Sequence, residues 1–95
     1  MTLTFATDRL IPADRVVTRV VGGSTVLLNA RTGATFALDE VGTRAWKALT
    51  IQPSLRAAFE TLLAEFEVDE VTLRRDLEEL IRRLVSSGLA TIAPA

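Results

Sequence analysis

The 95-residue sequence predicts an α+β domain in which a three-stranded antiparallel sheet is followed by three helices. Two observations predict this order. Residues 16–38 hold three short apolar segments separated by turns that contain glycine, and residues 39–88 hold apolar stripes at helical spacing. Strands and helices segregated in this way along a small chain are typical of a sheet whose helices cover one face.

The turns between the expected strands have the residues that hairpins require. Gly22-Gly23 forms a two-residue turn that tolerates positive φ. Gly33 is expected in the left-handed conformation of a G1 bulge. In the third strand, Phe36 and Leu38 share one face because side chains alternate along a strand. The expected strands are Val16–Val21, Thr25–Asn29 and Ala34–Leu38.

Each expected helix has a residue suited to capping its amino terminus. Asp39, Ser54 and Asp69 precede the three apolar stripes, and each side chain can accept a hydrogen bond from a free backbone N–H. The third helix runs from Glu70 to Ser87, with Gly88 at C′ and Leu89 completing a Schellman motif. Trp46 falls on the apolar stripe of the first helix, so we expect it in the core. The helices have the lengths and short connections of a helix-turn-helix, so the whole resembles a winged-helix variant with its sheet first.

The two ends of the chain give weaker patterns. Residues 1–15 are interpreted as an amino-terminal arm, in which the alternation of residues 2–6 predicts a short strand. Asp8–Arg15 contains Pro12 and is expected to be a connecting loop. Residues 16–92 form the expected domain, and residues 90–95 are expected to end it as a short tail.

The composition excludes most catalytic and metal chemistry. The chain has no cysteine and no histidine, so it lacks disulfides, thiolate ligands and the commonest general base. An acidic cluster is best explained by helix capping and surface charge; it comprises Glu65, Glu67, Asp69 and Glu70. We therefore expect no enzyme activity, no metal and no cofactor. The chain also lacks a signal peptide and a long apolar run, which favours a cytoplasmic protein without a membrane partner.

The charges of the third helix bear on nucleic-acid binding. Arg74, Arg75, Arg82 and Arg83 lie where a winged helix reads the major groove. Four acidic residues on the same helix offset these four arginines, and Glu78/Arg82 and Glu79/Arg83 are spaced as intrahelical ion pairs. Because affinity for duplex DNA rests on net neutralisation of phosphates, and the formal charge of the chain is −1, we expect no nucleic-acid partner.

An extended peptide is a better partner for this arrangement. The third strand lies at an edge of a simple meander, so its unpaired backbone groups can accept another strand by β-augmentation. The third helix offers mixed charge beside an apolar ridge. The simpler alternative, a short blunted edge with no partner, is equally consistent with the pattern alone.

VLLNARTGATFALDEVGTRAW (residues 26–46) combines an apolar strand, a turn ending in TG, an aromatic strand and a G-x-x-x-W helix. FEVDEVTLRRDLEELIRRLVSSGLA (residues 66–90) combines an aromatic residue, Val-Asp, a helix with an aspartate, leucines at core spacing and Gly-Leu. Together the two segments resemble the signature of PqqD-like proteins, the recognition elements of ribosomally made and modified peptides (RiPPs). The resemblance covers about residues 16–92. It differs in the connection at residues 50–53 and in the small Ala34 and Ala37, which we expect to open a pocket beside the strand.

The resemblance implies a non-catalytic protein that binds the leader segment of a precursor peptide. In that family the leader pairs antiparallel with the third strand and lies against the third helix. Carried onto this sequence, the implied peptide-binding residues of the strand are Ala34, Thr35, Phe36, Ala37 and Leu38. Those of the helix are Arg75, Asp76, Glu79, Leu80 and Arg83. The opposite flank of the helix is the alternative, with Arg74, Glu78, Ile81 and Val85, because periodicity does not say which flank faces the strand.

The resemblance also implies a partner enzyme. The sequence is most similar to the stand-alone recognition protein of lasso-peptide biosynthesis, which hands the leader to a leader peptidase or another modifying enzyme. Alternatives are a PqqD-type peptide chaperone for a radical SAM enzyme, a winged-helix DNA-binding protein, and a dimerisation module in which residues 3–5 add to a neighbouring sheet. The expected state is a monomer, with a homodimer as the alternative.

Overall fold

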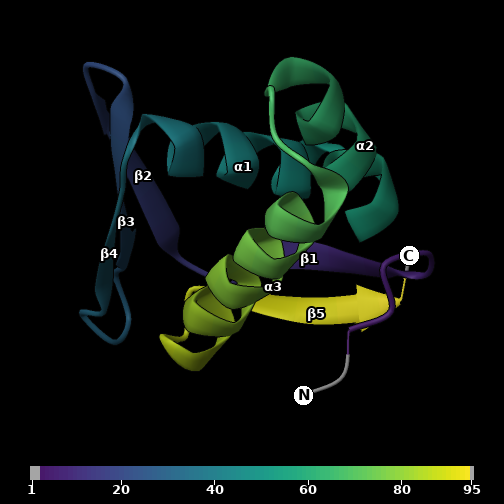
Figure 1. The fold of residues 1–95 in the computed structure, drawn as a ribbon. Helices are drawn as coiled ribbons and strands as arrows, with labels where there is room; N and C mark the ends of the chain where they lie inside the picture. Colours follow the sequence, from purple (N-terminus) through teal and green to yellow (C-terminus); the bar gives the residue numbers. More distant parts are fainter. Residues whose placement is uncertain (1–2, 95) are drawn as a thin grey trace.

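The computed structural model describes residues 3–94 and contains two small sheets and three helices (Figure 1). The strands are β1 (Asp8–Pro12), β2 (Val16–Val21), β3 (Ser24–Asn29), β4 (Thr35–Leu38) and β5 (Ala90–Pro94). The helices are α1 (Glu40–Ile51), α2 (Leu55–Glu65) and α3 (Glu70–Ser86). The expected α+β order of a three-stranded sheet followed by three helices is confirmed.

The larger sheet is an antiparallel meander in the order β2-β3-β4. Gly22 adopts a φ of +64° in the β2–β3 turn, and Gly33 a φ of +80° in the β3–β4 turn. The Gly33 N–H donates to the Asn29 carbonyl at 2.8 Å, while the Asn29 N–H donates to the Ala34 carbonyl at 2.9 Å. Two residues of one strand thus face one residue of the other, which is the expected G1 bulge.

The expected helix caps are also confirmed. Asp39, Ser54 and Asp69 each accept a hydrogen bond from the backbone N–H three residues later, at 2.7, 3.1 and 2.8 Å. At the end of α3, the Leu89 N–H donates to the Leu84 carbonyl, and Gly88 has a φ of +76°. This is the Schellman geometry, and it turns Leu89 fully into the core.

The interpretation of the chain ends was wrong in two places. Asp8–Pro12 is a strand rather than a loop, and Ala90–Pro94 is a strand rather than a tail. They pair antiparallel with each other, with Leu10 opposite Ile92, and form a separate two-stranded sheet. Both segments are five residues long and lie at opposite ends of the sequence, so neither shows a local pattern that reveals its partner. In Figure 1 this ribbon crosses behind α3.

The short strand expected at residues 2–6 is absent from residues 3–6, and residue 2 lies outside the described residues. A turn follows instead, in which the Asp8 N–H donates to the Thr4 carbonyl at 2.8 Å. The alternation of this segment reflects the burial of Phe5, which packs edge-to-face on Phe59 with ring centroids 6.1 Å apart.

One hydrophobic core joins all of these elements. The inner face of the larger sheet contributes Leu27 and Leu38, and β1 contributes Leu10. Trp46 is only 7% exposed, as its position on the apolar stripe of α1 predicts. The helices contribute most of the other large buried side chains, among them Leu49, Leu55, Leu62, Leu77, Ile81 and Leu84. No helix among residues 3–94 combines the length and the apolar character needed to cross a membrane.

A buried amide fixes the position of α3 relative to the sheet. The Asn29 side chain accepts hydrogen bonds from the Arg31 and Thr32 N–H groups and donates one to the Gly88 carbonyl at 2.9 Å. Asn29 is 2% exposed. Through these three hydrogen bonds the amide joins the β3–β4 turn to the end of α3.

Replacing Asn29 by aspartate tests this connection. The carboxylate of Asn29→Asp keeps the acceptor for the turn but places a charged oxygen against the Gly88 carbonyl. We expect the free energy of unfolding to fall by about 1–3 kcal/mol, measured by urea denaturation. Arg31→Ala, which removes an exposed side chain in the same turn, is the control and should change it by less than about 0.5 kcal/mol. Equal stability of Asn29→Asp and the wild type would contradict the assignment.

Candidate functional site

The free edge of β4 carries backbone groups without partners in the sheet. In an antiparallel pair, residues alternate between those bonded to the neighbouring strand and those whose N–H and C=O groups point away. The bonded pair at the bulge, Asn29 with Ala34, fixes this alternation. Phe36 and Leu38 therefore bond to β3, whereas Thr35 and Ala37 direct their N–H and C=O groups to the free edge.

The five expected strand residues thus differ in what they present. The Ala34 carbonyl is used by the bulge, and its N–H donates to Thr32 Oγ1 at 3.3 Å. Leu38 is buried and bonds to β3, so neither its backbone nor its side chain reaches the edge. Thr35 and Ala37 present backbone groups, while Phe36 presents a half-buried ring on the face that the helices cover.

One flank of α3 faces β4. The Arg83 guanidinium lies over the Phe36 ring, with 5.1 Å between Cζ and the ring centroid. A cation in this position is attracted by the electrons of the ring face. The contact identifies the flank of Asp76, Leu80 and Arg83 as the one beside the strand, a choice that sequence periodicity left open.

An apolar hollow of about 330 Å³ lies farther along the same flank. Asp76 and Leu80 line it from α3, and Val41 and Gly42 line it from the first turn of α1. Apolar side chains from α1, α3 and the α2–α3 connection complete the lining; they are Val41, Ala45, Phe66, Val68, Leu73 and Leu77. No residue of β4 lines this hollow, but the hollow and the Arg83–Phe36 contact lie on the same flank of α3. We use the name β4–α3 groove for the free edge of β4, this contact and the hollow taken together.

Gly42 explains part of the G-x-x-x-W pattern. A Cβ atom at this position would lie 3.2 Å from both Asp39 Oδ1 and Leu38 Cδ2, so a larger residue would require these two side chains to shift by a few tenths of an ångström. Gly42 and Ala45 both line the hollow. Two small residues of α1 therefore contribute to the space of this hollow. Neither Ala34 nor Ala37 lines it, so the pocket expected from them beside the strand is not this hollow and stays a prediction.

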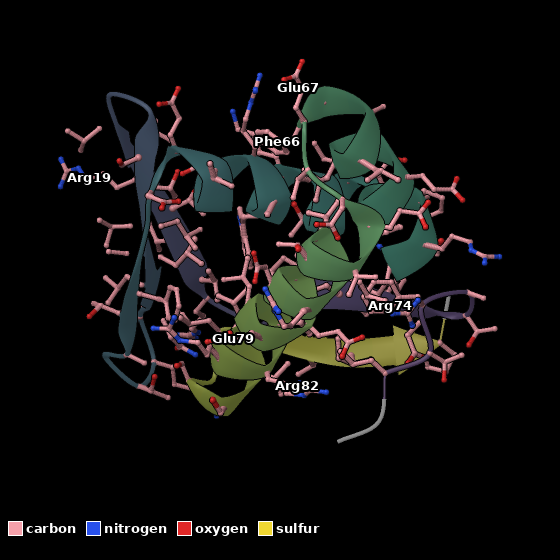
Figure 2. All side chains as sticks on the ribbon, viewed as in Figure 1. Arg19, Phe66, Glu67, Arg74, Glu79 and Arg82 are labelled. Atoms are coloured by element: carbon pink, nitrogen blue, oxygen red, sulfur yellow. The ribbon has the colours of Figure 1, made fainter. Side chains whose placement is uncertain are left out.

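Two expected helix residues lie away from the groove. At about 100° per residue, Arg75 and Glu79 sit roughly 160° around the helix from the buried Leu77. Both are exposed, and Glu79 extends from the outer side of α3 (Figure 2). The expected Glu79–Arg83 ion pair is absent from residues 3–94, because Arg83 turns toward Phe36. The expected Glu78–Arg82 pair is present at 3.3 Å.

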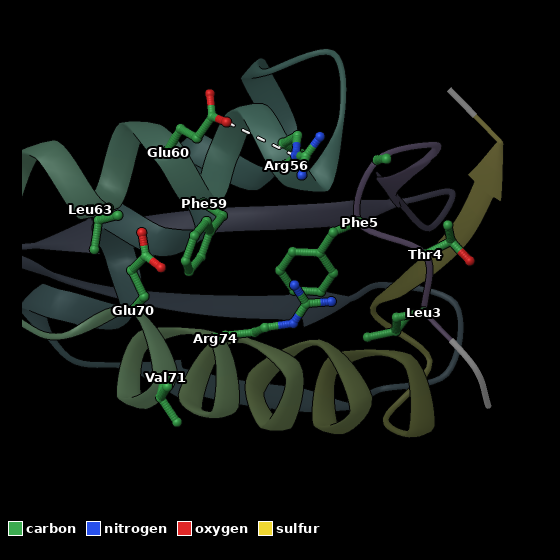
Figure 3. Close-up of a pocket in the computed structure, with 11 residues that line it drawn as sticks. Leu3, Thr4, Phe5, Arg56, Phe59, Glu60, Leu63, Glu70, Val71 and Arg74 are labelled. Atoms are coloured by element: carbon green, nitrogen blue, oxygen red, sulfur yellow. Dashed lines mark ion pairs between the residues drawn. The ribbon is translucent and has the colours of Figure 1, made fainter.

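The opposite flank of α3 already has intramolecular partners. Arg74 stacks on the Phe5 ring at 4.4 Å and pairs with Glu78 at 3.1 Å. Ile81 is fully buried in the core. A hollow of about 590 Å³ lies on this side, between the amino-terminal segment, α2 and α3 (Figure 3). Although larger, it lies on the flank of α3 away from the Arg83–Phe36 contact, and charged side chains from both helices surround it, including the Arg56–Glu60 pair.

Asp69 caps the amino terminus of α3, between Val68 and Leu73 of the apolar hollow. Hydrogen bonds from the Thr72 backbone N–H and then the Thr72 hydroxyl lower the pKa of Asp69 below its usual value. The carboxylate therefore stays charged and keeps its cap at neutral pH. Across residues 3–94, no three His, Cys, Asp or Glu side chains are grouped to hold a metal ion.

The sequence analysis did not identify the residues of α1 and of the α2–α3 connection that line the apolar hollow. Val41, Phe66 and Val68 approach one another only through the packing of α1 against α2 and of the α2–α3 connection against α3. The signal in the sequence was Val41, an apolar residue two positions after the Asp39 cap; in the structure its side chain is 58% exposed.

Comparison with known proteins identifies the family. Residues 24–90 match the family described as coenzyme PQQ synthesis protein D (PqqD). The chain therefore belongs to the PqqD family. No curated protein sequence matches it. Among solved structures, it is similar to TbiB1 in complex with the TbiA(beta) leader peptide, at 34% sequence identity and a TM-score of 0.77. That match covers 84% of this chain and 93% of TbiB1.

Proposed function

We propose that this protein binds the leader segment of a ribosomally synthesised precursor peptide in the β4–α3 groove, without catalysing a reaction. The observation that carries the proposal is the free edge of β4, whose Thr35 and Ala37 backbone groups face outward beside an apolar hollow. The similarity to TbiB1, which was solved with a leader peptide, supports the same partner class here.

The groove suits an extended peptide that pairs antiparallel with β4. Backbone hydrogen bonds to Thr35 and Ala37 supply affinity that depends little on sequence. Alternate side chains of the added strand point toward the helices, where they meet Phe36, Leu80 and Arg83. An apolar side chain of the peptide fills the hollow beside Leu80, and this contact supplies specificity.

The balance of free energies on leader binding is consistent with a protein that binds the peptide and presents it to a partner enzyme. A disordered leader loses conformational entropy when it docks, and the strand hydrogen bonds and one or two apolar anchors offset that loss. Holding the leader raises the local concentration of the attached core peptide near a partner enzyme. We propose a leader peptidase or another modifying enzyme of lasso-peptide biosynthesis as that partner, in the cytoplasm, where the precursor is made. The alternative is that the protein presents its peptide to a radical SAM enzyme.

Proline at Ala37 tests the strand pairing. Because the Ala37 N–H points to the free edge, Ala37→Pro removes a donor for the peptide and leaves the β3–β4 hydrogen bonds intact. We expect its affinity for a fluorescently labelled leader peptide, from the precursor encoded beside this protein, to fall more than tenfold by anisotropy. Circular dichroism should show an unchanged fold.

The matched control is Phe36→Pro, which removes a donor that β3 needs and should therefore destabilise the sheet itself. A duplex DNA probe in the same titration should stay flat at low salt. Full leader affinity in a folded Ala37→Pro variant would rule out augmentation at β4. Salt-sensitive DNA binding together with a flat leader signal would favour a winged-helix DNA-binding protein instead.

Charge reversal at Arg83 tests the flank of α3. Arg83→Glu removes the cation from the Phe36 ring and places a carboxylate in the groove, so we expect leader affinity to weaken by roughly tenfold. Arg82→Glu makes the same change of charge one residue earlier, on the opposite flank, and should leave affinity within about twofold. Equal effects of the two substitutions would show that only net charge matters, and an effect of Arg82→Glu alone would move the site to the other flank.

A further inference from the structure

The larger sheet has a second free edge, at β2, that the proposed leader site does not use. Five of the six residues of β2 are exposed. They include three valines on both faces of the strand: Val17 is 53% exposed, Val20 59% and Val21 68%. Valine side chains this exposed bury little apolar surface within one chain. The strand's composition therefore points to an additional partner that covers them.

The backbone of this edge is free to pair. Val21 faces Ser24 across the two-residue turn, and the Arg15 carbonyl bonds to the Ala30 N–H at 3.0 Å, so Val17, Arg19 and Val21 bond to β3. Thr18 and Val20 direct their N–H and C=O groups outward, as does the Val16 carbonyl. Strand edges in monomeric proteins are usually blocked by proline, a bulge or several charges. Within β2 the single charged residue is Arg19, and its side chain leaves the outer face of the sheet, away from the helices (Figure 2).

We propose that β2 pairs antiparallel with β2 of a second copy of this chain, with Thr18 on the two-fold axis. A two-fold axis perpendicular to the sheet allows two registers with long overlap. One places Arg19 opposite Arg19 of the second copy, where two like charges repel. The other places Thr18 opposite Thr18, Val16 opposite Val20, and Val17 opposite Arg19 of the second copy, so no like charges meet.

This register gives both hydrogen bonds and apolar contacts. The Thr18 N–H donates to the Thr18 carbonyl of the second copy, and the Val20 N–H donates to the Val16 carbonyl. On the inner face, the exposed Val20 packs beside Val16 of the second copy, which already packs against the core. On the outer face, Val17 lies under the aliphatic part of Arg19. Cross-strand pairs of this kind each contribute about 0.2–1 kcal/mol.

A second copy fits this edge better than the leader does. At the β4 edge, the Arg83–Phe36 contact links the strand to α3. The side chains of α3 can therefore contact the side chains of a peptide that pairs with β4. Figure 1 shows α3 on the β4 side of the molecule, with its carboxyl-terminal end near the β3–β4 turn, and β2 at the opposite edge of the sheet. The β2 edge therefore offers backbone pairing and valine contacts that are self-complementary, as a two-fold interface requires.

The proposed dimer leaves the leader sites free. The six strands run in the order β4-β3-β2 and then β2-β3-β4 of the second copy, so the two β4 edges lie at the outer ends. The perpendicular two-fold axis keeps the helices of both copies on one side of the sheet. Each chain can then bind one leader, and dimerisation and leader binding do not compete.

Sedimentation velocity over a protein concentration series tests the proposal. An interface made of one strand edge is smaller than a standard protein–protein interface, so we expect a reversible dimer at micromolar to millimolar concentration. Thr18→Pro removes an outward donor without touching the β2–β3 hydrogen bonds and should sediment as a monomer throughout. It should keep the leader affinity of the wild type, whereas Ala37→Pro should still dimerise, so the two proposals fail separately.

A second pair of variants keeps the test decisive if Thr18→Pro does not fold. Val20→Lys places a charge beside Val16 of the second copy and should weaken dimerisation at least tenfold. Because the chain has no cysteine, Thr18→Cys introduces a single thiol that a short bismaleimide should cross-link into a dimer, whereas Ala37→Cys at the outer end should not cross-link. A wild type that remains monomeric at millimolar concentration, or cross-linking that is equal at both positions, would overturn the proposal.

Discussion

The hydrogen bonds of Asn29 determine which parts of the sheet are free to bind. Its backbone groups pair with Gly33 and Ala34 in the bulge, and this pairing fixes the alternation of bonded and free groups across all three strands. Thr35 and Ala37 face outward at one edge for this reason, and Thr18 and Val20 at the other. Its side chain also holds the Gly88 carbonyl, so the same residue positions the carboxyl-terminal end of α3.

The placement of α3 makes the two edges of the sheet unequal. At β4, the helix adds a charged contact at Phe36 and an apolar hollow that begins beside Leu80. At β2, the strand offers only its backbone and its own exposed valines. The first edge has what a specific peptide needs, since backbone pairing supplies affinity and the pockets supply selection. The second has what a symmetric partner needs.

The sequence predicts the elements whose signals are local. Caps at Asp39, Ser54 and Asp69, the bulge at Gly33 and the Schellman turn at Gly88 all follow from residue types at fixed short spacing. Local signals do not predict the β1–β5 ribbon, because its two strands are separated by almost the whole chain. In addition, Pro12 at the end of β1 is more typical of a loop. The choice of flank on α3 likewise depends on a tertiary contact, between Arg83 and Phe36, that no spacing reveals.

Amide hydrogen exchange measured by NMR, with and without saturating leader peptide, tests the central claim most directly. If the leader adds a strand to β4, the Thr35 and Ala37 amides should become strongly protected, while those of Phe36 and Leu38, already bonded to β3, should change little. Protection that appears at Thr18 and Val20 instead, or on the Arg74 side of α3, would contradict binding at the β4–α3 groove.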